Sequence, residues 1–126
     1  MEQKINEIEI NGIKYVPKSE INSMASSVNG MQQVLIRTYS AGVHFGFLAK
    51  RESTLAGVEV KLIKARRVFY WSGAASLSQM ANDGVSKPSD CKFSQPVDSI
   101  DLVAIEIIPL TEKAANNLNK VAIWQV

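Results

Sequence analysis

The sequence predicts an α+β fold: a mainly antiparallel, curved sheet or small barrel with short helices attached. Several short segments alternate apolar and polar side chains, which is typical of half-exposed antiparallel strands. Helix-capping residues precede three other short segments, and no repeat, low-complexity tract or long linker divides the chain. We therefore expect one domain over residues 1–126, with a ligand-binding core at 34–126.

The first segment, residues 1–30, is expected to form a hairpin followed by a short helix. Apolar residues alternate around Asn11-Gly12, a turn pair that favours a two-residue hairpin. Ser19 is placed to cap a helix over residues 20–29, which Gly30 would end. That helix carries only a narrow apolar stripe, so the segment is a candidate oligomerisation element.

The middle of the chain is rich in branched and aromatic residues with a period of two, so it is expected to be strand. Ser40-Ala41-Gly42 is expected to bend the chain between the first two strands, and the polar residues 50–57 are expected to be a loop. The expected strands cover residues 34–39, 43–47, 58–63 and 67–71.

Capping signals place two helices in the second half. Ser76 and Gln79 form a capping-box pair for a helix that continues through Asn82, and Thr111 is placed to cap a last helix to about residue 119. Between them, after a loop at 88–96, residues 100–108 are rich in branched side chains and are expected to supply one or two buried strands. The tail, residues 121–126, is expected to be a final short strand with its Trp124 packed or shared with a neighbouring subunit.

Composition narrows the functional classes. Hydrophobic residues make up 46% and charged residues 21%, which is ordinary for a soluble globular protein, and so small a domain often gains stability by association with copies of itself. A net charge of +2 weighs against non-specific nucleic-acid binding, which needs a basic face. The single Cys91 excludes an internal disulfide and indicates a reducing compartment such as the cytoplasm. No apolar run reaches the roughly 20 residues of a membrane span, and no signal peptide is recognised.

The same inventory argues against an enzyme. A nucleophile–histidine pair would have to use His44, the only histidine, which lies in an alternating strand without a recognisable motif. One His, one Cys and scattered carboxylates do not make a metal set. Asp98 and Asp101 would lie on opposite faces of a strand, so they are expected to be solvated charges and not a hydrolytic pair. We expect no catalytic residues, no metal and no cofactor.

Residues 65–78, ARRVFYWSGAASLS, have the parts of a nucleotide-shaped site. Guanidiniums match phosphate oxygens, aromatic rings offer faces to a base, and free N–H groups at a helix start favour an anion. Arg66 and Arg67 are adjacent on a strand, so only one can reach a given pocket, and the other is expected to serve a salt bridge or a subunit contact. The rings of Phe69 and Trp71 have an alternative role in the core. The residues predicted to bind ligand are Arg37, Tyr39, Arg66, Arg67, Trp71, Ser72 and Ser76.

Two long motifs, residues 34–46 (VLIRTYSAGVHFG) and 65–78, carry a resemblance. Together with CKF at 91–93 and AIEII at 104–108, they resemble small phage and prophage proteins identified as the first Thoeris anti-defence proteins, over residues 34 to about 112. The resemblance implies a sponge that acts in the cytoplasm of an infected bacterial host. It would bind cyclic ADP-ribose isomers made by TIR-domain sensors, with cyclic oligonucleotides as further ligands, without cleaving them. It also implies homo-oligomers, as large as hexamers, with pockets between protomers.

Two other classes stay open at this point. The chain could be a phage structural or interaction protein whose motifs encode only a core and an oligomer interface, without a small-molecule ligand. It could also be a barrel-type module that stacks single-stranded nucleic acid on its aromatic side chains, although the modest net charge weighs against this.

Overall fold

A computed structural model describes residues 8–10, 13–15 and 30–125. Its main sheet has the strand order β4-β3-β7-β5-β6, and β4 also pairs with β5, so the sheet closes partly into a ring. Every strand pairing in this sheet is antiparallel. The predicted α+β class with a curved antiparallel sheet is confirmed. The strands are β3 (Gln33–Thr38), β4 (Val43–Thr54), β5 (Gly57–Tyr70), β6 (Lys92–Phe93) and β7 (Val97–Pro109).

The predicted N-terminal hairpin is also confirmed. Strands β1 (Ile8–Ile10) and β2 (Ile13–Tyr15) pair antiparallel, with Ile10 opposite Ile13. The helix expected at 20–29 lies outside the described residues.

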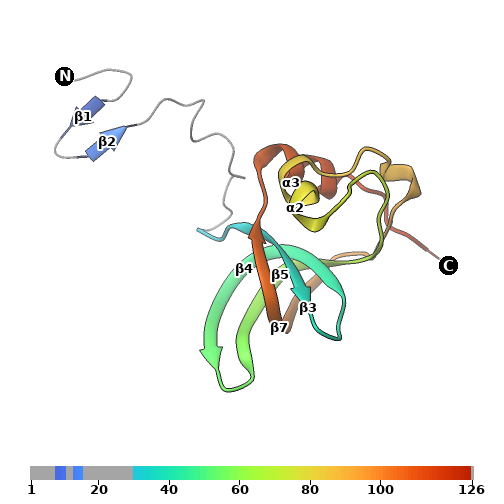
Figure 1. Ribbon diagram of the computed structural model, residues 1–126, viewed down its shortest axis with the longest axis horizontal. Helices are drawn as coiled ribbons and strands as arrows, with labels where there is room; N and C mark the ends of the chain where they lie inside the picture. Colours follow the sequence, from blue (N-terminus) through green and yellow to red (C-terminus); the bar gives the residue numbers. More distant parts are fainter. Residues whose placement is uncertain (1–7, 11–12, 16–29, 126) are drawn as a thin grey trace.

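The expected loop at residues 50–57 is wrong. β4 continues to Thr54 and the chain reverses over only two residues before β5 starts at Gly57, so most of the segment is paired strand. Figure 1 shows β4 and β5 curving away together as one long hairpin. Residues 49–53 of this arm are all exposed, and because successive side chains of a strand alternate between its faces, both faces are solvated here. Polarity here marked a strand exposed on both faces and not a loop.

The next two expected strands, 58–63 and 67–71, are one strand with an irregularity. Ile63 lies opposite Phe47 and Arg66 opposite Phe45, so Gly46 alone faces two residues of β5, Lys64 and Ala65. This is a β-bulge, and its first residue, Lys64, takes the left-handed conformation, with φ 55°. A Cβ on Gly46 would lie 3.0 Å from both the Ala65 Cα and the Ile63 carbonyl oxygen, which explains the glycine.

β7 also differs from expectation. Residues 100–108 lie in one continuous strand, and only alternate side chains are buried. Leu102 and Ala104 point into the ring, whereas Val103 and Ile105 are exposed on its outer face. Hydrophobic content therefore did not imply burial on both faces. Asp98 and Asp101 are solvated, as expected, and lie within 4 Å of Lys64 and Lys61 respectively.

The two faces of the sheet carry separate cores. The face covered by the helices includes Leu35, Phe45, Val68 and Phe93. The inside of the ring is filled by a second set, Val34, Ile36, Val60, Leu62, Ala65, Leu102 and Ala104. Figure 1 shows both helices gathered on one side of the sheet, with the β4–β5 arm extending away from them.

The two predicted helix caps are confirmed. Ser76 accepts a hydrogen bond from the Gln79 N–H at the start of α2 (Leu77–Asp83), and Thr111 accepts one from Ala114 at the start of α3 (Glu112–Asn119). Gly84 ends α2, where the Asn117 side chain leaves no space for a Cβ.

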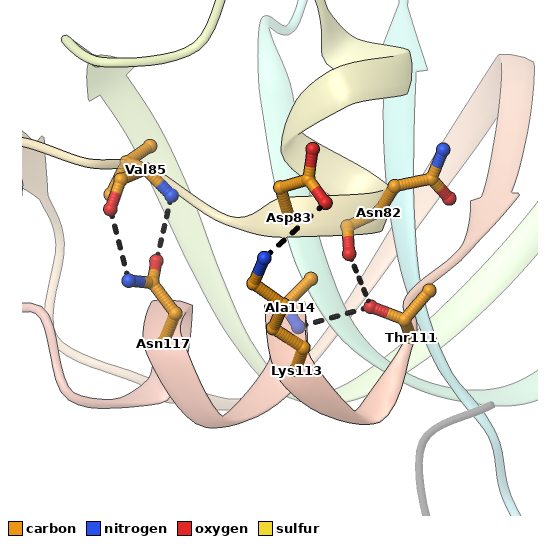
Figure 2. A network of polar contacts seen from close by, with 7 residues as sticks. All are labelled: Asn82, Asp83, Val85, Thr111, Lys113, Ala114 and Asn117. Carbon is orange, nitrogen blue, oxygen red and sulfur yellow. Dashed lines mark hydrogen bonds and ion pairs between the residues drawn. The ribbon is translucent and has the colours of Figure 1, made fainter. Parts of the chain in front are cut away.

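Polar contacts bind α2 to α3 (Figure 2). The Asn117 amide donates to the Val85 carbonyl and accepts from the Val85 N–H, at 2.9 and 2.7 Å. At the other end of α3, the Thr111 hydroxyl donates to the Asn82 carbonyl at 2.6 Å. The chain that follows residues 65–78 is therefore fixed to the last helix, and both cover the same face of the sheet.

The tail forms less strand than expected. Ile123 makes an isolated parallel bridge to Phe93, and the Trp124 N–H donates to the Phe93 carbonyl at 2.9 Å. The described part of the tail, up to residue 125, thus runs beside the short edge strand β6 without extending the sheet.

Candidate ligand-binding groove

The bulge at Lys64 decides which arginine faces which side. Before it, Val60 and Leu62 point into the ring; after it, Ala65 does, so the alternation has shifted by one residue. Arg66 therefore points toward the core under the helices, and Arg67 points toward the concave side. The two guanidiniums leave opposite faces, as the sequence predicted.

Arg67 lies in a groove of about 270 Å³ that opens beside the ring core. Strands β4, β5 and β7 supply its walls together with the segment after β6. Its lining combines one cation, one imidazole, one hydroxyl and four apolar side chains: Arg67, His44, Ser94, Ala65, Phe69, Val97 and Ile100.

The Arg67 guanidinium lies over the Phe69 ring, 6.0 Å from its centroid. The backbone N–H of Arg67 donates to the Ser94 hydroxyl at 2.8 Å, which fixes this part of β5 against the segment after β6. No carboxylate in the described ranges forms an ion pair with Arg67. Its charge is consequently available to an anion, and the aromatic ring beneath it limits the guanidinium's freedom.

His44 forms the inner wall of the groove and is only 1% exposed. Its Nε2 lies 2.8 Å from the Ala41 carbonyl, so Nε2 carries a proton and donates. Burial lowers the pKa of His44 below its ordinary 6.5; the hydrogen bond to Ala41 opposes this, and the charge of Arg67 adds to it. The imidazole is therefore held neutral beside the cation.

An aromatic pair extends the groove. Phe69 and Trp124 meet edge to face with centroids 5.7 Å apart, and Lys92 Nζ lies 5.2 Å from the centroid of the Trp124 ring. Both rings keep considerable surface in solvent, 53% for Phe69 and 41% for Trp124. Arg67, Phe69, Trp124 and Lys92 form a continuous row in which a cation stands at each end; we call it the cation–aromatic row.

Arg66 has a different environment. It is 5% exposed, and its guanidinium donates to the backbone carbonyls of Ser94 and Val121 at 2.7 and 2.9 Å, with longer contacts of 3.4 Å to those of Leu118 and Ala122. The rings of Phe45 and Phe93 lie within 6 Å of its centre, and burial lowers its pKa. Arg66 therefore holds the end of α3 and the tail to the sheet, and its donors are directed at the protein's own backbone.

Arg37 and Tyr39 lie where β3 ends and turns into β4. Arg37 Nε donates to Glu106 at 2.8 Å in an exposed ion pair, and Tyr39 is 91% exposed. Arg37 stands opposite Val43, which in turn stands opposite Val68, so it lies two strand spacings, about 10 Å, from β5. These two residues are near the same end of the sheet as Arg67 but do not line its groove.

Trp71, Ser72 and Ser76 belong to the turn that leads into α2. The Trp71 indole donates to the Ala74 carbonyl, the Ser72 N–H donates to the Cys91 sulfur, and Ser76 caps the helix. Gly73, with φ 95°, lets this turn pass against Ser86 and Lys87. None of the three predicted residues lines the groove. The structure thus brings Arg67 alone, of the seven predicted residues, to the groove.

Sequence reasoning missed eight of the nine residues of the groove and the row: His44, Ala65, Phe69, Lys92, Ser94, Val97, Ile100 and Trp124. For Phe69 the sequence leaves two roles open, an aromatic of the motif or a core residue, and its parity with Arg67 was the signal for the groove; the structure leaves its ring 53% exposed. Lys92 and Trp124 gave no local signal, because their meeting depends on a tail that crosses beside β6.

Two further observations describe the chemistry present. Within the described residues, no three His, Cys, Asp or Glu side chains gather closely enough to hold a metal ion. None of the helices described here has the length and apolar character needed to cross a membrane.

The fold and groove define a small α+β protein with a partly closed antiparallel ring, a cation-bearing groove and two helices on the outer face. The chain belongs to the family described as a domain of unknown function (DUF6948), whose model matches residues 31–118. The match includes the groove strands and the motif at 65–78, and the description carries no activity. No curated protein and no solved structure matches the sequence.

Proposed function

We propose that this protein binds and sequesters a small phosphorylated nucleotide without degrading it. The observation that carries the proposal is the Arg67 guanidinium, which lines a groove of about 270 Å³, lies 6.0 Å from the centroid of the Phe69 ring and forms no ion pair within the described chain. A cation fixed over a ring provides a phosphate contact next to a surface on which a base can stack.

The resemblance of residues 34–46 and 65–78 to the first Thoeris anti-defence proteins gives the ligand to test first, a cyclic ADP-ribose isomer made by a TIR-domain sensor. In this proposal the protein acts in the cytoplasm of an infected bacterium as a homo-oligomer, and removes an immune signal from its receptor. A sponge effective at nanomolar concentration needs about 12 kcal/mol of binding free energy. Charge-assisted phosphate contacts and well-packed base contacts would both have to contribute.

The test is retention and release. Purified protein is mixed with the cyclic ADP-ribose isomer, unbound ligand is removed, the protein is heat-denatured, and the supernatant is analysed by mass spectrometry. We expect intact ligand in the supernatant. An altered product would mean an enzyme and would contradict sequestration.

Charge-matched variants make the test specific. Arg67→Ala should weaken retention at least about tenfold while the fold is kept, because it removes the groove cation. Arg51→Ala is the control, since it deletes the same charge from the exposed part of β4, outside the groove. Equal retention by the two variants would remove Arg67 from the site. If no ligand is retained even by the unaltered protein, a structural role or single-stranded nucleic acid becomes the better hypothesis.

A further inference from the structure

We propose that His44 determines the specificity of the groove, because its Nδ1 atom accepts a hydrogen bond from a ribose hydroxyl of the ligand. This inference rests on the proposed function, since it takes the phosphate to be bound at Arg67. It requires a ligand in which a hydroxyl lies close to a phosphate. A cyclic ADP-ribose isomer meets this requirement, because its diphosphate is bonded to ribose rings that carry free hydroxyls.

His44 and Arg67 are neighbours in the fold. They lie directly opposite each other in the pairing of β4 with β5, and both line the groove. The side chains of such a pair leave the same face of the sheet, with Cβ atoms about 5 Å apart. The charge of Arg67 is accordingly one cause of the lowered pKa of His44. A phosphate held by Arg67 can therefore bring the sugar bonded to it within reach of the imidazole.

The protein uses one nitrogen of this imidazole and leaves the other unpaired. Nε2 donates to the Ala41 carbonyl at 2.8 Å, and no described residue forms a hydrogen bond with Nδ1. The two nitrogens of an imidazole point away from each other, so Nδ1 is directed away from Ala41. A neutral imidazole with its proton on Nε2 has an acceptor at Nδ1. A buried acceptor without a partner costs free energy, which a donor on the ligand would recover.

The charge state of His44 selects the kind of ligand group. Burial is the largest cause that lowers its pKa, and Arg67 is the charged group that faces it from β5. The other groove residues near the ring, Ser94 after β6 and Ile100 on β7, carry no charge. At neutral pH, Nδ1 therefore accepts a hydrogen bond and does not donate one. Its matching partner is a hydroxyl, because an ionised phosphate has no proton to donate.

The remaining lining of the groove does not compete for that hydroxyl. The Ser94 hydroxyl accepts from the Arg67 N–H at 2.8 Å and donates to the Gln95 carbonyl at 3.0 Å, so the protein already uses it in both directions. The other lining side chains, apart from Arg67, are apolar. Nδ1 of His44 is thus the side-chain acceptor that the lining leaves without a partner. Because the ring is almost fully buried, it can contact only a small group such as a hydroxyl.

The experiment combines changes in the ligand with changes in His44. The ligands are the cyclic ADP-ribose isomer and analogues of it that each lack one free ribose hydroxyl, titrated calorimetrically into the full chain at neutral pH. We expect one analogue to bind the unaltered protein about tenfold more weakly than the isomer, a difference of about 1.4 kcal/mol. That analogue identifies the hydroxyl that contacts Nδ1.

Two variants separate the two nitrogens. The amide of His44→Gln can still donate to Ala41 but places no acceptor at the position of Nδ1. We expect His44→Gln to bind the isomer about tenfold more weakly than the unaltered protein does, and to bind the isomer and the identified analogue equally. The shorter amide of His44→Asn lies near the position of Nδ1 and loses the contact with Ala41. His44→Asn should therefore still prefer the isomer to the analogue, although its free energy of unfolding falls. Circular dichroism of both variants checks that they are folded.

The outcomes distinguish this inference from the proposed function. If every analogue binds the unaltered protein as tightly as the isomer does, Nδ1 holds a water molecule or nothing, and the inference is overturned while sequestration stands. The same conclusion follows if His44→Gln weakens the isomer and the identified analogue by the same factor, because His44 would then act without that hydroxyl. The comparison of ligands on the unaltered protein decides the matter even if neither variant folds. If the isomer does not bind the unaltered protein, both the inference and the proposed ligand are overturned.

Discussion

Arg66 and Arg67 are neighbours in the chain and opposites in the fold. Arg66 is almost fully buried under α3, where it donates to several backbone carbonyls, whereas Arg67 lies in the concave groove without a carboxylate partner in the described chain. The same residue type is a structural clamp on one face and a candidate ligand contact on the other. The role of a guanidinium therefore depends on the groups that it contacts and not on its presence in a motif.

The largest effect is expected when each arginine is truncated in turn. Arg66→Ala should lower the free energy of unfolding by about 3 kcal/mol, because several buried carbonyls lose their donor. Arg67→Ala should change the free energy of unfolding by less than about 1 kcal/mol, because the contact with the Phe69 ring is the structural contact of its side chain in the described chain. Urea unfolding of the two variants provides the measurement. Similar losses of unfolding free energy in the two variants would contradict the assignment of a structural role to Arg66 and not to Arg67.

The bulge that separates the two faces can be tested at Gly46. Gly46→Ala places a methyl group about 3 Å from the backbone of β5, so we expect a loss of about 1–3 kcal/mol in unfolding free energy. Gly42→Ala, at a turn with open space but φ 84°, tests backbone strain without a clash and is the comparison variant. A Gly46→Ala protein as stable as the unaltered one would contradict the close approach.

The concave face should also respond to pH through His44, the only histidine. Since burial lowers the pKa of His44 in the folded state, the unfolded chain binds more protons below pH 6.5. Stability is therefore full above that pH and is lost as the pH falls below it, by at most about 1.4 kcal/mol per pH unit for one proton. Unfolding measured between pH 7.5 and 5 should show this loss, and His44→Gln should remove it. An identical pH profile in the variant would assign the loss to other groups.

The smallest effect is expected at the bulge residue itself. Lys64 has φ 55°, a conformation that costs a non-glycine residue about 1 kcal/mol. A glycine avoids this cost but loses about as much free energy through the greater conformational entropy of its unfolded chain. The two effects nearly cancel, so we expect Lys64→Gly to raise the free energy of unfolding by no more than about 0.5 kcal/mol. Lys64→Val, a β-branched residue, should destabilise at the same position. Thermal unfolding of both variants would show whether each substitution stabilises or destabilises the folded protein. A Lys64→Val protein as stable as the unaltered one would argue against the left-handed conformation.

Most of the local elements could be predicted from the sequence. The hairpin around residues 11–12, the strands at 34–39 and 43–47, and the helix starts at Ser76 and Thr111 follow from patterning and capping, which act over a few residues. It also established that Arg66 and Arg67 leave opposite faces, because that follows from strand geometry alone.

Which of the two arginines enters the groove could not be predicted from the sequence, because it depends on the pairing of β4 with β5. The bulge opposite Gly46 shifts the alternation of β5 by one residue, and a bulge is a property of a strand pair that neither strand reveals alone. The same holds for the cation–aromatic row, in which Trp124 reaches Phe69 and Lys92 because Arg66 and Phe93 hold the tail beside β6. Local physics fixed where the strands and helices form, and long-range pairing fixed which side chains share a surface.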